Sequence, residues 1–112
     1  MQELTIQQKT IDMFEYSYLI LKQYPKHEKF VLVSEIKNIL NNILKLVITG
    51  VKKYYKKTTL QDLDVELAKL KVFARMSKNL EYIKSKTYEI WIRKIVEIGR
   101  MVGGWIKSVN NK

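Results

Sequence analysis

The residues Lys52 to Lys57, which read KKYYKK, are the part of the sequence best suited to binding a ligand. Lysine side chains bind phosphate groups, and an exposed tyrosine ring can stack on an unpaired nucleobase. Two tyrosines between two pairs of lysines could therefore contact both the backbone and the bases of a nucleic acid. The alternative interpretation is a helix end, where the helix dipole favours cations, with the two tyrosines half-buried.

Further basic residues extend this pattern into the neighbouring segments. Between Glu35 and Asp62 the chain has no acidic residue, although it has several lysines. Further along, three basic residues at steps of four and three lie on one side of a predicted helix. The eight candidates for phosphate contacts are Lys45, Lys52, Lys53, Lys56, Lys57, Lys71, Arg75 and Lys78.

The chain as a whole is strongly basic. Its 112 residues include 21 lysines and arginines but only 11 acidic residues, which gives a formal net charge of +10. Such a surface attracts polyanions, above all nucleic acids, and then acidic proteins or anionic membrane surfaces. Solubility alone is the other explanation, but acidic residues serve solubility as well or better. We therefore expect contacts with a phosphate backbone that weaken as the salt concentration rises.

Patterns for catalysis and metal binding are missing from the sequence. The chain has no cysteine, and its one histidine, His27, lies in a lysine-rich turn without a second metal ligand. Three of the four glycines lie late in a predicted helix, whereas a phosphate-binding loop needs them between a strand and a helix. The sequence therefore predicts no enzyme, no metal or other cofactor, and no small-molecule substrate.

The spacing of the apolar residues predicts four helices, at about 4–22, 30–55, 60–82 and 87–109. The first ends before Pro25, because the residue that precedes a proline is pushed out of helical geometry. Loops of this length force neighbouring helices to run in opposite directions. We therefore predict one all-α domain over residues 1–112, an antiparallel up-down-up-down four-helix bundle.

Two local features of these helices give sharper predictions. Thr59 lies three residues before Asp62, which resembles a capping box and places the start of the third helix near Leu60. In the first helix the apolar residues fall on one face, which should pack into the core. That face consists of Leu4, Ile11, Phe14, Tyr18 and Leu21.

The predicted last helix has two apolar rows where a bundle needs one. Trp91, Ile98 and Trp105 are spaced by seven and form the second row. They could turn inward and thicken the core, or they could form a contact between subunits, where aromatic residues are enriched. Gly99 and Gly103 lie four apart on one face, which would let a neighbouring helix or a tryptophan ring approach the backbone closely.

The sequence also bears on where the protein works. Its apolar runs are shorter than a membrane-spanning helix needs, and its first residues lack the pattern of a secretory signal. Without cysteine there is no disulfide framework. We therefore expect a cytoplasmic protein that does not enter a membrane.

Three stretches resemble a known family of four-helix-bundle proteins: YPKHEKFVLVSEIKNIL, DLDVELAKLKVFARMSKNL and EIGRMVGGWIKSV. The family includes the accessory variability determinant (Avd) of diversity-generating retroelements and the proteins encoded in intervening sequences of bacterial 23S ribosomal RNA genes. The most specific part of the resemblance is the pattern formed by Gly99, Arg100, Gly103, Trp105 and Ile106.

The resemblance implies a basic homopentameric barrel of four-helix bundles. In retroelements such a protein binds the reverse transcriptase and the template RNA and supports mutagenic cDNA synthesis, without catalytic residues of its own. The implied partners are RNA, DNA or an RNA–DNA hybrid, a reverse transcriptase and further copies of the chain. Two alternatives stay open, an intervening-sequence-type bundle without a polymerase partner and a basic scaffold for other proteins.

Overall fold

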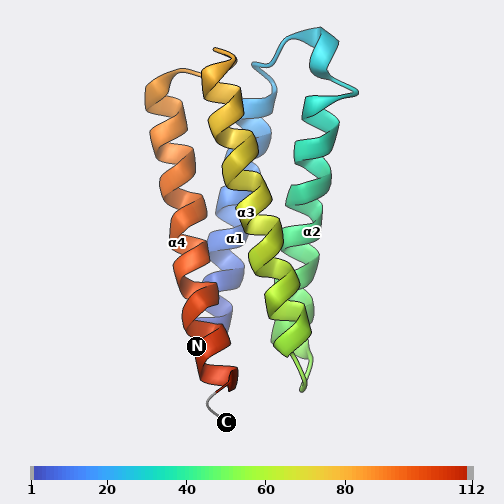
Figure 1. The fold of residues 1–112 in the computed structure, drawn as a ribbon, viewed down its shortest axis with the longest axis vertical. Helices are drawn as coiled ribbons and strands as arrows, with labels where there is room; N and C mark the ends of the chain where they lie inside the picture. The colour runs from blue at the N-terminus through green and yellow to red at the C-terminus, as the bar shows by residue number, and fades with distance from the viewer. Residues whose placement is uncertain (1, 111–112) are drawn as a thin grey trace.

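The computed structural model describes residues 2–110 of the chain, and it describes Gln2 by its backbone only. Four long helices run through these residues, and a short 3₁₀ helix, η1, lies between the first two. Figure 1 shows that consecutive helices run in opposite directions, so the predicted all-α antiparallel four-helix bundle is confirmed. In chain order the elements are α1 (Gln2–Leu21), η1 (Lys26–Glu28), α2 (Leu32–Lys52), α3 (Lys57–Asn79) and α4 (Ser85–Asn110).

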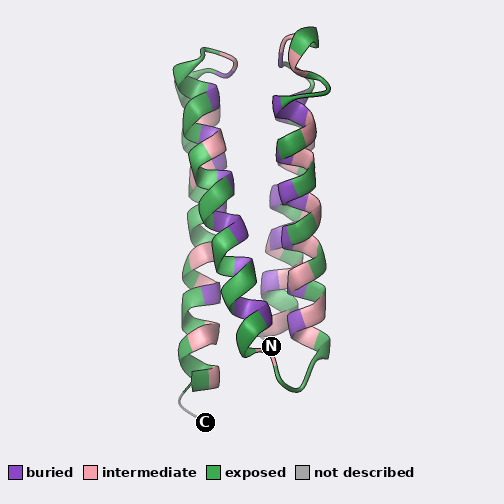
Figure 2. Ribbon diagram, turned by 45° about the vertical axis from the view of Figure 1, so that its right-hand side comes forward, coloured by how far each residue is buried: buried purple, intermediate pink, exposed green. Residues whose placement is uncertain are grey.

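The four helices surround one apolar core. Both α1 and α3 pack against α2 and α4. Figure 2 shows the buried residues on the faces that the helices turn toward one another and the exposed residues on the outside. No helix within residues 2–110 is long and apolar enough to cross a membrane.

The bundle has two different ends (Figure 1). The α2–α3 turn, residues 53–56, lies with the start of α1 and the end of α4 at one end, which we call the terminal end. The α1–α2 and α3–α4 connections lie at the opposite end. There the Tyr82 hydroxyl donates a 2.7 Å hydrogen bond to Glu28 Oε2, which ties the two connections together and raises the pKa of Tyr82.

The start of α3 differs from the prediction. The helix begins at Lys57, its N-cap residue Lys56 makes no side-chain cap hydrogen bond, and Thr59 is buried inside the helix, so the predicted capping box is wrong. With the earlier start, Leu60 is fully buried and lies close to Gly50 of α2. Tertiary packing contributes most of the stability of helices in proteins, so this burial outweighs a local cap.

The buried face of α1 also differs from the prediction. Of the predicted face, Leu21 is buried in the core, whereas Leu4 is 66% exposed and the rings of Phe14 and Tyr18 are only partly buried. The helix instead turns a row that includes two hydroxyl residues toward the core, and each hydroxyl donates a 2.7 Å hydrogen bond to the carbonyl four residues earlier. Because these bonds satisfy the polar groups, the helix can bury them. The observed row consists of Ile6, Thr10, Met13, Ser17 and Ile20.

Part of the second apolar row of α4 lies in the core of the single chain. Trp91 and Ile98 are fully buried, as are Ile95 and Val102. The indole Nε1 of Trp91 donates a 2.7 Å hydrogen bond to the Ser17 hydroxyl of α1. The polar residue that breaks the apolar pattern of α1 is therefore the partner that this tryptophan needs when it is buried.

Trp105, the last member of that row, lies against the backbone of α2. A Cβ atom added at Gly50 would be 3.1 Å from Cη2 of the Trp105 ring and 3.3 Å from Cδ2 of Leu60. Only a residue without a side chain leaves the ring this much space. The close approach of a ring was predicted at Gly99 and Gly103, and the structure instead has one at Gly50 of α2.

The glycines of α4 have open surroundings within the described chain. A Cβ atom added at Gly99, Gly103 or Gly104 would meet nothing within 4 Å. No helix of residues 2–110 therefore uses these positions for a close approach. A close approach at Gly99 and Gly103 by another chain stays a prediction.

Replacing glycine by alanine should separate these two kinds of site. Alanine favours a helix interior by about 1 kcal/mol relative to glycine. We expect Gly104→Ala to raise the free energy of unfolding by up to that amount, because nothing opposes the new methyl group. Gly50→Ala should gain less or lose stability, because the Trp105 ring must shift.

Urea unfolding followed by circular dichroism measures both variants. In a Trp105→Leu background, Gly50→Ala should recover part of the gain, since the contact with the indole ring is gone while Leu60 Cδ2 stays within 3.3 Å of the new Cβ. Equal stabilisation by Gly50→Ala and Gly104→Ala in the original background would contradict the close contact between Trp105 and α2.

Candidate nucleic-acid interface

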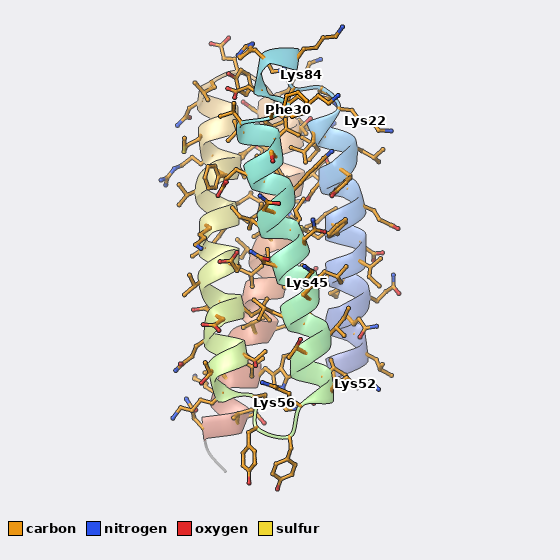
Figure 3. All side chains as sticks on the ribbon, turned by 90° about the vertical axis from the view of Figure 1, so that its right-hand side faces the viewer. Lys22, Phe30, Lys45, Lys52, Lys56 and Lys84 are labelled. Atoms are coloured by element: carbon orange, nitrogen blue, oxygen red, sulfur yellow. The ribbon has the colours of Figure 1, made fainter. Side chains whose placement is uncertain are left out.

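The eight candidate phosphate-binding residues form two groups and one separate lysine. The structure places one group around the α2–α3 turn and the other along α3, while Lys45 lies further back along α2, about two helical turns before Lys52 (Figure 3). All of them are exposed except Lys56, which is half-buried. We call Lys52, Lys53, Lys56 and Lys57 the terminal group, and Lys71, Arg75 and Lys78 the α3 ridge.

The two groups lie far apart. An α-helix rises 1.5 Å per residue, so along the axis of α3 Lys57 is about 21 Å from Lys71, the nearest member of the ridge, and about 32 Å from Lys78, the farthest. The ridge extends toward the end opposite the terminal group, and there Lys78 Nζ lies 5.1 Å from the centre of the Tyr88 ring of α4. The chain therefore offers two basic surfaces, and one compact ligand cannot bind both.

A cavity of about 970 Å³ adjoins the terminal group. Residues 52–57 line one part of it, Glu3 and Ile6 of α1 another, and Met101, Trp105 and Val109 of α4 the rest. Its wall thus combines lysine side chains with apolar and aromatic ones. This combination suits a ligand that carries both negative charge and a flat apolar ring.

Lys56 differs from the rest of the terminal group because it is already engaged. Its Nζ lies 3.6 Å from the Glu3 carboxylate and 5.5 Å from the centre of the Trp105 ring. A lysine over the face of a tryptophan is attracted by the negative charge of the ring face. Lys56 therefore links the turn to α1 and α4, and it leaves Lys52, Lys53 and Lys57 as the exposed members of the group.

Tyr54 and Tyr55 stand in solvent at the tip of the turn. They are 87% and 86% exposed. Their ring centres are 4.8 Å apart and the rings are nearly perpendicular. Because α2 ends at Lys52 with Lys53 as its C-cap, two of these lysines do lie at a helix C-terminus, as the alternative interpretation holds. Its second part, half-buried tyrosines, is wrong.

Glu66 of α3 has hydrogen-bond partners that explain it as a structural residue. Glu66 is the one buried acid within residues 2–110, and it accepts hydrogen bonds from Asn42 of α2 at 3.0 Å and from Lys69 at 2.8 Å. Burial alone raises the pKa of this carboxyl, but the bonds from Lys69 and Asn42 outweigh it, and the net pKa is lowered. In the described part of the chain, no three His, Cys, Asp or Glu side chains cluster as metal ligands would.

The cavity is the feature that sequence reasoning missed. Its walls come from three segments that are distant in the sequence, so no motif predicts it. One signal was present in Gly50, which lies on the buried stripe of α2 and is the only glycine before the last helix. A glycine at such a position indicates that another part of the chain approaches closely, and here that part is the Trp105 ring beside the cavity.

Comparisons with known proteins place the chain in a family. No curated protein matches it. A family model described as bAvd-like matches residues 4–109, which include the turn, the α3 ridge and nearly all of the four helices. The match confirms the resemblance seen in the three sequence stretches. The chain is an Avd-type accessory protein and belongs to the bAvd-like family.

Proposed function

We propose that this protein is the accessory subunit of a diversity-generating retroelement. It binds the template RNA and the reverse transcriptase of the element and supports mutagenic cDNA synthesis, while the polymerase chemistry belongs to its partner. The observation that carries the proposal is the bAvd-like match over residues 4–109. The distribution of charge supports the RNA-binding part.

Most of the candidate phosphate contacts carry charge that the protein itself does not neutralise. Within residues 2–110, Lys56 is the only one of the eight that forms an ion pair. The two other lysines in ion pairs, Lys9 with Glu97 and Lys69 with Glu66, are outside the set. Seven exposed positive charges therefore have no acidic partner, and six of them also lie over no aromatic ring of the described residues, Lys78 being the exception. Contacts of such charges with phosphates bind the backbone with little sequence preference.

We also propose that the protein assembles into a homopentamer. The open surroundings of Gly99 and Gly103 support this, because a helix of another copy can approach α4 closely there. Val96 lies in the same part of α4 and is partly exposed, which adds apolar surface for such a contact. A solution mass of five times the 13.3 kDa of one chain supports the assembly, and a monomer would contradict it.

Neutralising two lysines of the terminal group should weaken RNA binding in a salt-dependent way. The double variant Lys53→Gln/Lys57→Gln removes two exposed charges beside the cavity. For a single strand, log K falls with log salt, and each phosphate contact adds about 0.7 to the steepness of this fall. The double variant should therefore make the slope less negative by about 1.4.

Fluorescence anisotropy titrations at several salt concentrations measure this slope. The matched control is Lys9→Gln/Lys94→Gln, which changes the net charge equally, but at lysines already engaged by Glu97 and by the Tyr16 ring. We expect the control to keep the original slope. If the original protein fails to bind RNA even at low salt, the RNA-binding part of the proposal is lost.

The reverse transcriptase should copurify with the protein. Co-expression of the tagged chain with the reverse transcriptase of its genetic neighbourhood, followed by affinity purification with and without ribonuclease, tests this expectation. Recovery in both conditions indicates a direct contact between the two proteins, and recovery only without ribonuclease indicates a bridge of RNA. Absence of the polymerase in both would favour the intervening-sequence type of protein or a basic scaffold.

A further inference from the structure

We infer that the terminal end binds an unpaired stretch of nucleic acid, with bases stacked on Tyr54 and Tyr55 and phosphates bound by Lys52, Lys53 and Lys57. This inference rests on the proposed function and deepens it, because it names the class of nucleic acid and the place where it binds.

The two tyrosine rings are available for stacking. Both are almost fully exposed, and each touches the other edge to face, so at least one face of each ring is open. Stacking on an aromatic ring requires a base whose own face is free, and single strands offer such faces while duplexes hide them between neighbouring base pairs. A pair of open rings therefore favours an unpaired strand.

Positive charge surrounds the rings on both sides along the chain. Lys52 and Lys53 precede the tyrosines, Lys57 follows them, and all three side chains are exposed. None of these lysines forms an ion pair with an acid in residues 2–110. Phosphates on either side of a stacked base would thus meet positive charge.

The adjoining cavity is large enough for a base. Its volume of about 970 Å³ lies at the upper end of the range for small-molecule pockets. Ile6, Met101 and Val109 supply apolar wall. A base that has no pairing partner can rotate out of the stack of its neighbours and enter the cavity, whereas a paired base must first break its pair. The cavity and the rings thus select the same kind of ligand.

The turn is held in place by Lys56. Its ammonium group lies over the Trp105 ring and beside the Glu3 carboxylate, so this lysine anchors the turn between α1 and α4. The same contact covers the Trp105 ring and leaves the tyrosines as the exposed rings at this end. An acidic protein segment is the competing ligand. Its carboxylates could pair with the lysines, but they offer no flat ring to stack on the two exposed tyrosines.

The test compares binding of a single-stranded RNA and of an RNA duplex of equal length to the full chain. In Tyr54→Ala/Tyr55→Ala we expect affinity for the single strand to fall by roughly tenfold or more, because stacking on even one ring is worth about that factor. Affinity for the duplex should change by less than about twofold. Tyr54→Phe/Tyr55→Phe keeps the rings and should keep the affinity.

Phe30 provides a matched control at the opposite end of the bundle (Figure 3). It is 84% exposed and its ring lies 5.3 Å from Lys29 Nζ, so it too is an open ring beside a lysine. Phe30 does not line the cavity of the terminal end. We expect Phe30→Ala to leave the affinity for the single strand within about twofold of the original.

Each outcome separates this inference from the proposed function. Equal losses on single strand and duplex, an unchanged affinity in Tyr54→Ala/Tyr55→Ala, or an equal loss in Phe30→Ala would overturn the inference while RNA binding stands. Loss of copurification with the reverse transcriptase, without any loss of RNA affinity, would assign the rings to a protein contact and overturn it as well. Failure of the original protein to bind either RNA would instead overturn the RNA-binding part of the proposed function.

Discussion

The contact between the Trp105 ring and the backbone of α2 at Gly50 is the constraint on which the terminal end depends. The ring reaches from α4 across to α2, where a Cβ atom added at Gly50 would lie 3.1 Å from it and would force it to shift. Lys56 then lies over the ring and pairs with Glu3 of α1, so one indole ring connects three helices and the turn. The rest of the turn projects into solvent because its anchor is already in place.

The bundle does not depend on its surface charges for folding, so a strongly basic chain can fold with part of its charge unpaired. The apolar core and a few polar contacts between helices hold the bundle together, among them the bond from Trp91 to Ser17 and the bond from Asn42 to Glu66. Surface ion pairs contribute little to folding. The exposed lysines are therefore free to bind a partner without loss of stability.

Sequence reasoning was most successful for the helices and least successful for their details. Apolar residues that recur at three and four positions are enough to predict a helix, and all four were found. The buried face of α1 was wrong except at Leu21, because Thr10 and Ser17 are polar by type, yet buried with hydroxyls that bond to carbonyls of the same helix. The further bond that Ser17 accepts comes from Trp91, 74 residues away, so the sequence around Ser17 does not indicate it.

The candidate site was predictable in its residue types and not in its shape. The KKYYKK stretch indicated a surface with both lysines and tyrosines. The exposure of both rings agrees with this interpretation and not with half-buried tyrosines. Its neighbours Glu3 and Trp105 lie near the two ends of the chain, so only the packing of the helices could bring them to the turn. The special role of Lys56 follows from that packing alone.

Ultraviolet crosslinking of the full chain to a single-stranded RNA, with the modified residues identified by mass spectrometry, tests the central claim most directly. The claim is that the α2–α3 turn is the place where nucleic acid binds. We predict crosslinks concentrated on Tyr54 and Tyr55, because both rings would lie against bases. Crosslinks on Phe30 or along the α3 ridge, with none in the turn, would contradict the claim.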